Sequence, residues 1–162
     1  MAKLINKLKN DQEKDIYRKL GRYCAYRERA ESEVWNKLKE LEVSENLSFK
    51  LIDLLKKDKF LNNKRFARFY AQGKFLNNQW GKIKIRTGLR AKKISTENIN
   101  FAIDRIDDEL YLETLDKLIE KKAKNIKDKQ IFVFRKKIVD FLRGKGYEVE
   151  ICWNLVKKKY PS

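Results

Sequence analysis

Apolar residues recur three and four positions apart along most of this chain, the spacing of one face of an α-helix. Residues that break helices are scarce, since the only proline is Pro161 and there are six glycines. The pattern therefore predicts an all-α protein. We expect nine helices, near residues 12–29, 31–42, 45–57, 62–78, 80–92, 95–106, 107–125, 129–144 and 147–159.

Several predicted helix ends carry residues suited to capping. Ser44, Asn62-Asn63 and Ser95-Thr96 precede helices and offer a side-chain oxygen to the unpaired N–H groups of the first turn. Gly144 and Gly146 suit a left-handed cap before the last helix.

An internal repeat organises these helices. SENLSFKLIDLL, which starts at Ser44, resembles TENINFAIDRI 52 residues later, and EVEICWNLV lies another 52 residues on. Three columns are apolar in all copies, with the middle one aromatic throughout: Leu47/Ile99/Ile151, Phe49/Phe101/Trp153 and Leu51/Ile103/Leu155. The preceding helix repeats as Val34/Ile85/Ile138 and Leu38/Leu89/Leu142, with the middle copy shifted by one residue.

The repeat predicts three tandem three-helix units stacked into an elongated curved rod. We place an N-terminal segment and the first unit in residues 1–57, the second unit in 58–106 and the third in 107–162. One such unit buries little apolar surface alone, so stacking on its neighbours completes the core. The concave face of the rod would suit another extended molecule.

The charge along the chain is strongly positive and uneven. Forty Lys and Arg stand against 23 Asp and Glu, a net charge of +17. Residues 56–93 are the most basic, with thirteen cations and one acid; 94–120 hold two against eight, and 121–162 thirteen against four. Apolar residues make up 42% of the chain, so it folds rather than forming a disordered basic tail. The positive electrostatic field of such a chain indicates that its binding partner is a polyanion or an acidic protein surface.

The residue inventory argues against catalysis. With no histidine, the chain lacks Ser/His and Cys/His nucleophile pairs and every His-containing zinc site. No phosphate-binding glycine motif or CxxC pair occurs. We interpret the acidic residues at a helix junction as caps rather than as a metal site: Asp104, Asp107, Asp108 and Glu109. We therefore expect no enzyme, no metal and no cofactor.

The same inventory suggests a cellular setting. Cys24 and Cys152 lie within apolar helical patterns, so we expect small buried side chains and a reducing compartment. No apolar stretch resembles a secretory leader or a membrane span. A cytoplasmic monomer without membrane contact is the expectation.

The sharpest candidate surface is a cationic stripe on the helix at 80–92. Lys82, Arg86 and Arg90 fall on one helix face that continues to Lys93, bordered by Ile83 and by Trp80 at the helix start. With cations of the preceding helix, the predicted binding face is Lys64, Arg65, Arg68, Lys74, Lys82, Arg86, Arg90 and Lys93. A secondary patch is Arg135, Lys136 and Lys137, near a Lys157–Lys159 run. Alternatively, both sets of cations form solvent-exposed helix faces that bind nothing. Trp80 would then be a structural residue that packs against the start of its helix.

Three segments resemble a known family. Residues 60–69, FLNNKRFARF, are similar to the YLDDxRFAxxF segment of the bacterial regulatory protein RecX family, and WGKIKI at 80–85 resembles the GxxRI segment that follows it. Arg27-Glu28-Arg29 with residues 33–38 looks like that family's RxxS…ELxxKL. The resemblance extends over about residues 12–160. Asn62-Asn63 replaces the usual acidic pair, and Ala30 stands where a capping serine is common.

The resemblance implies a non-enzymatic modulator of the recombinase RecA. Such proteins lie in the helical groove of the RecA filament on single-stranded DNA and limit strand exchange, ATP hydrolysis and coprotease activity in DNA repair, homologous recombination and the SOS response. Two alternatives remain open from the residues: a stand-alone, sequence-independent nucleic-acid-binding protein, and an adaptor for an acidic protein.

Overall fold

The computed structural model describes residue 5 and residues 8–162, and it is helical as predicted. Residues 8–162 contain no strand. The helices of that range are α2 (Asp11–Tyr26), α3 (Glu31–Glu40), α4 (Glu45–Lys57), α5 (Asn63–Asn78), α6 (Lys82–Ala91), α7 (Thr96–Ile103), α8 (Asp108–Ala123), α9 (Ile131–Lys145) and α10 (Val149–Lys159).

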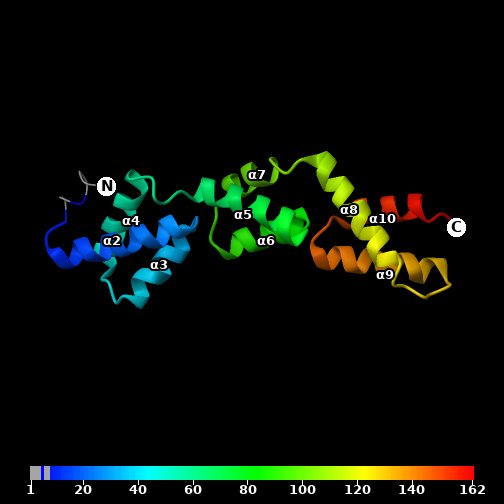
Figure 1. The fold of residues 1–162 in the computed structure, drawn as a ribbon, viewed down its shortest axis with the longest axis horizontal. Helices are drawn as coiled ribbons and strands as arrows, with labels where there is room; N and C mark the ends of the chain where they lie inside the picture. The colour runs from blue at the N-terminus through cyan, green and yellow to red at the C-terminus, as the bar shows by residue number, and fades with distance from the viewer. Residues whose placement is uncertain (1–4, 6–7) are drawn as a thin grey trace.

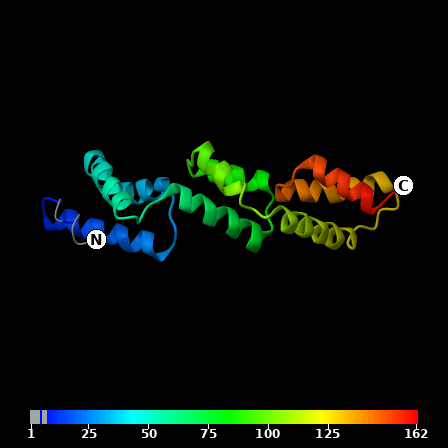
Figure 2. The same ribbon diagram turned by 90° about the horizontal axis from the view of Figure 1, so that it is seen from above.

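The helices follow one another along a rod rather than around a central point. Helices α2–α4 lie at one end, α5–α7 in the middle and α8–α10 at the other end, in both views (Figures 1 and 2). This confirms the all-α repeat rod. The helix at 45–57 has the predicted ends. The helix predicted to reach residue 29 stops at Tyr26, because Arg29 folds back and donates its Nε–H to the Tyr23 carbonyl (3.1 Å).

The same turn closes the second helix of each repeat. Glu42, Lys93 and Gly146 stand at equivalent positions, all with positive φ (53°, 58° and 91°). In each turn the next N–H bonds to the carbonyl of the repeated leucine: Val43 to Leu38 (3.1 Å), Ile94 to Leu89 (3.2 Å) and Tyr147 to Leu142 (3.1 Å). The repeat is therefore a repeat of backbone geometry, although only the third copy has the glycine that favours it.

The two non-glycine copies carry backbone strain that glycine would relieve. Glu42→Gly is expected to raise the free energy of unfolding by about 0.5–1 kcal/mol, since left-handed φ costs an L-residue more than glycine loses in unfolded-state freedom. Glu40→Gly, in the last turn of α3, is the control and should lower it by a similar amount. Urea unfolding followed by circular dichroism measures both. Equal effects of the two variants would contradict the strain at Glu42.

The capping predictions are met in part. Asn62 accepts from the Arg65 N–H, Ser95 from the Asn98 N–H and Asp107 from the Leu110 N–H. Ser44 precedes α4 as predicted, but its side chain makes no cap bond; it is exposed, where solvent can serve those N–H groups. Gly144 is also a correction, because it lies inside α9, which Gly146 alone ends in left-handed geometry.

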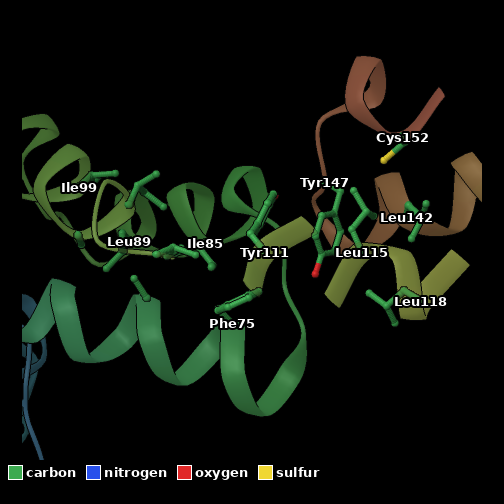
Figure 3. Packing of buried hydrophobic residues seen from close by; sticks show 14 of the residues in the cluster. Phe75, Ile85, Leu89, Ile99, Tyr111, Leu115, Leu118, Leu142, Tyr147 and Cys152 are labelled. Atoms are coloured by element: carbon green, nitrogen blue, oxygen red, sulfur yellow. The ribbon is translucent and has the colours of Figure 1, made fainter. Parts of the chain in front are cut away.

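The buried apolar residues form two clusters. One lies mainly in the first unit and includes Leu20, Leu38 and Leu51, with Leu61 from the start of the second unit. The other runs without a break from α5 through α10, so the second and third units share one core. Tyr111 lies at its middle, with its ring centroid 5.7 Å from that of Phe75 and 5.0 Å from that of Tyr147 (Figure 3).

Backbone contacts fasten the second unit to the third. Gly81 donates its N–H to the Lys145 carbonyl (2.8 Å), and Ile83 donates to the Gly146 carbonyl (3.0 Å). A Cβ on Gly81 would lie 2.2 Å from the carbonyl carbon and oxygen of Gly146. Close approach of two backbones therefore requires glycine at this position.

Polar contacts fasten the first unit to the second. The Glu31 N–H donates to Asn63 Oδ1 (2.9 Å), and the Ser32 hydroxyl donates to the Lys92 carbonyl (2.7 Å). Ala30 offers no capping oxygen; instead its own N–H donates to the Glu33 carboxylate (2.9 Å). Asn63 is one of the two asparagines that replace the acidic pair of the resembled family, and it thus helps to hold adjacent units together.

Candidate functional site

The predicted stripe on α6 lies along the side of that helix that faces α7 and α8. Lys82 is only 20% exposed in its side chain, because its Nζ lies 4.7 Å from the Tyr111 ring centroid and 2.7 Å from Asp108 Oδ1. This ammonium lowers the pKa of the Asp108 carboxyl through its hydrogen bond and its charge. Arg86 is half-buried and donates to Asn100 Oδ1 (2.6 Å). Arg90 is exposed, as is Lys93 in the following turn.

The cations of α5 also divide into one that is held by intramolecular contacts and others that are exposed. Arg65 is a structural clamp: its Nε bonds to Glu28 (2.5 Å), and another guanidinium nitrogen donates to the Lys59 carbonyl (3.0 Å). Lys64 is exposed and lies 4.1 Å from the Phe101 ring centroid on α7. Arg68 is also exposed.

Trp80 packs against the shared core and is flanked by two cations. Lys74 Nζ and Lys84 Nζ each lie 4.8 Å from its ring centroid. This packing fits the alternative in which Trp80 is a structural residue at the start of α6. The Trp80 ring also holds both ammonium groups near the start of that helix. Lys74, predicted as a site residue, is therefore accompanied by Lys84, which the stripe on α6 did not include.

The predicted secondary patch is largely occupied by intramolecular contacts. Arg135 donates its Nε–H to the Tyr160 carbonyl (2.8 Å), which fixes the C-terminal end of α10. Lys136 pairs with Asp140 (2.6 Å), and Lys137 pairs with Asp128. The two lysines remain exposed at the surface.

Sequence reasoning overlooked two cations that pack on aromatic rings. Arg105 lies with its guanidinium carbon 3.5 Å from the Phe101 ring centroid. Lys92 approaches both Glu33 (3.5 Å) and the Phe66 ring (5.9 Å) at the first junction. Spacing could have indicated Arg105, because residues 101 and 105 share a face of the helix predicted over 95–106. In the structure α7 ends at Ile103, and Arg105 lies in the turn that follows it.

Among the described residues no group of three or more His, Cys, Asp or Glu side chains could hold a metal ion. Cys24 and Cys152 are buried free thiols as predicted, and burial raises the pKa of Cys24 to about 11. Nor does that part of the chain contain a helix long and apolar enough to cross a bilayer.

Comparison with known proteins identifies the fold's relatives. The family model described as "RecX, second three-helix domain" matches residues 62–103, and "RecX, third three-helix domain" matches 108–161. Together they cover more than half of the chain. This chain belongs to the RecX family. The resemblance in the sequence segments is thereby confirmed.

Individual RecX proteins show how far the similarity extends. "Regulatory protein RecX" of Bacillus mycoides (strain KBAB4) is 27% identical over 157 residues, which are 95% of this chain and 58% of that protein. The RecX of Clostridium perfringens (strain 13 / Type A) is 30% identical over 132 residues, 80% and 61% of the two chains. The chain thus spans less than two thirds of these curated relatives. The crystal structure of RecX from Lactobacillus salivarius has the same fold, with a TM-score of 0.82, 24% identity, and coverage of 99% of this chain and 98% of that one.

Proposed function

We propose that this protein binds the RecA filament on single-stranded DNA, lies in its helical groove and inhibits the recombinase, ATPase and coprotease activities of RecA in DNA repair and the SOS response. The family supplies a regulatory role, and RecA is the partner that the resemblance implies. The proposal needs no catalytic group, and it has the protein act as a cytoplasmic monomer.

The observation that carries the proposal is an extended rod with a basic middle section. A rod can follow a groove and touch several subunits, whereas a sphere of equal mass meets few (Figure 2). The middle section, α5–α7, contains exposed cations on α5 and at the end of α6: Lys64, Arg68, Arg90 and Lys93. These groups can meet DNA phosphates or acidic surface of RecA.

The structure changes which cations should be tested. The stripe predicted on α6 suggests a variant without Lys82, Arg86 and Arg90, but Lys82 and Arg86 already bond to Asp108 and Asn100. Their loss would alter both folding and binding. Arg68, Arg90 and Lys93 are exposed, and no hydrogen bond or ion pair of their side chains occurs among the described residues.

Arg68→Ala, Arg90→Ala and Lys93→Ala combined are expected to raise the half-inhibitory concentration for RecA ATPase about tenfold. Each lost exposed charge contact removes roughly 0.5 kcal/mol. If the contacts are to DNA phosphates, the slope of log affinity against log salt should fall by about 2. ATP hydrolysis by RecA on single-stranded DNA, at three salt concentrations, gives both values.

A charge-matched variant controls for the change in net charge. Lys19, Arg22 and Lys39 are exposed cations of the first unit, and their replacement by alanine also removes three charges. This control should inhibit nearly as well as the unchanged protein. Equal inhibition by both triple variants would refute the assignment of the binding surface to the second unit. No inhibition by the unchanged protein would refute the proposed function.

A further inference from the structure

Two aromatic rings stack on the surface of the third unit. Phe132, near the start of α9, and Trp153, in the middle of α10, have ring centroids 6.1 Å apart and planes only 18° from parallel. Phe132 is 64% exposed, so much of its ring is open to solvent. Because the rings are nearly parallel, a further flat ring placed on Phe132 would extend the same stack.

A cation accompanies this pair of rings. Lys157 Nζ lies 5.7 Å from the Trp153 ring centroid, one helical turn along α10, and its side chain is exposed. We call Phe132, Trp153 and Lys157 the aromatic platform. It lies in the segment 121–162, where thirteen basic residues stand against four acidic ones. An anion approaching the platform therefore meets a favourable field.

The internal repeat reproduces the aromatic–cation pair of the platform in the second unit. Phe101 and Arg105 occupy the positions of Trp153 and Lys157, 52 residues earlier, and the Arg105 guanidinium carbon lies 3.5 Å from the Phe101 ring centroid. In the first unit the corresponding positions hold Phe49 and Asp53, and Asp53 pairs with Lys57. The aromatic–cation pair thus occurs in the two units that carry the excess positive charge.

We infer that the aromatic platform binds single-stranded nucleic acid directly, with a base stacked on Phe132 and the neighbouring phosphate near Lys157. Stacking on aromatic side chains combined with cations for the backbone is the usual chemistry of sequence-independent binding to single strands. The inference deepens the proposed function and rests on it for its biological setting. It assigns the DNA contact to this chain itself rather than to RecA alone.

The charge favours a nucleic acid over a protein as the occupant. An exposed aromatic ring also suits an apolar protein pocket, but such a pocket would need an acidic residue at its rim to use the adjoining ammonium group. A nucleotide uses both parts of the platform, since every base has a flat face and every linkage a negative charge. Docking of a protein on Phe132 is therefore treated as a competing outcome of the test.

Binding of labelled oligothymidylate to the full chain, without RecA, tests the platform. Phe132→Ala is expected to weaken binding about tenfold, since one stacked base contributes roughly 1–3 kcal/mol. An abasic oligonucleotide of equal length offers the phosphates alone, so the variant should bind it as the unchanged protein does. Phe132→Trp restores a flat ring and should retain binding to oligothymidylate. Fluorescence anisotropy at low salt measures all three.

Tyr26→Ala is the matched control. Tyr26 is another exposed aromatic residue, 85% accessible, at the end of α2. It lies in residues 1–55, where twelve basic residues stand against ten acidic ones, so its surroundings carry little excess positive charge. Its removal should leave binding of both oligonucleotides unchanged. A Phe132→Ala variant that binds oligothymidylate like the unchanged protein overturns the inference.

Two results separate this inference from the proposed function. If Phe132→Ala weakens inhibition of RecA but not binding to the free strand, the ring docks on protein and the inference fails. If the unchanged protein does not inhibit RecA but shows the Phe132 dependence on oligothymidylate, the inference stands and the proposed function fails.

Discussion

Replacing Gly81 by alanine is expected to lower the free energy of unfolding by about 3 kcal/mol, the combined effect of overpacking and of weakened backbone hydrogen bonds. The new Cβ would lie 2.2 Å from the carbonyl group of Gly146 and 2.4 Å from the Tyr147 nitrogen. These neighbours are backbone atoms, so no side chain can turn aside. To make room, α6 must move away from the α9–α10 turn, which lengthens the bonds from Gly81 to Lys145 and from Ile83 to Gly146.

Gly144→Ala is the control for this prediction. Gly144 lies inside α9, and a Cβ there meets no atom within 4 Å. Alanine should raise the free energy of unfolding by about 0.5–1 kcal/mol, because it is the better helix former. Chemical unfolding followed by circular dichroism compares the two variants. A Gly81→Ala protein as stable as the unchanged one would mean that the second and third units are not fastened through this contact.

The fold could be predicted from the sequence because its signals are local and repeated. The spacing of apolar residues predicted each helix of residues 8–162, and the 52-residue offset predicted their grouping. The left-handed turns at Glu42 and Lys93 could not be foreseen, since neither is glycine. Their geometry follows from the packing of neighbouring helices, which overrides the preference of the residue. The shared core of the second and third units also depends on contacts between distant segments.

The candidate site was predictable only as a region. Composition located the basic block at 56–93, and helical spacing gave the stripe on α6. Which cations remain available depends on partners far away in sequence, such as Asp108 for Lys82 and Glu28 for Arg65. The aromatic platform escaped notice for the same reason, because the stack of Phe132 on Trp153 exists only after α9 and α10 pack together.

Tyr111 is the residue whose removal should cost most. Its ring lies in the shared core between Phe75 and Tyr147, and its hydroxyl accepts from the Lys82 N–H (3.0 Å) and donates to Glu148 Oε2 (2.7 Å). One side chain thus joins the start of α6, the interior and the start of α10. Burial raises the pKa of Tyr111, so the hydroxyl stays protonated and able to donate across the physiological range.

Tyr111→Ala is expected to lower the free energy of unfolding by about 4–5 kcal/mol, and Tyr111→Phe by about 1.5–2.5 kcal/mol. The phenylalanine variant keeps the ring and loses the two hydrogen bonds, so the difference between the variants measures the ring. Tyr26→Ala is the control, because Tyr26 is 85% exposed and should change stability by no more than about 0.5 kcal/mol. Thermal and urea unfolding give the three values. If Tyr111→Phe is as stable as the unchanged protein, the hydroxyl does not join α6 to α10, and packing alone aligns the two units.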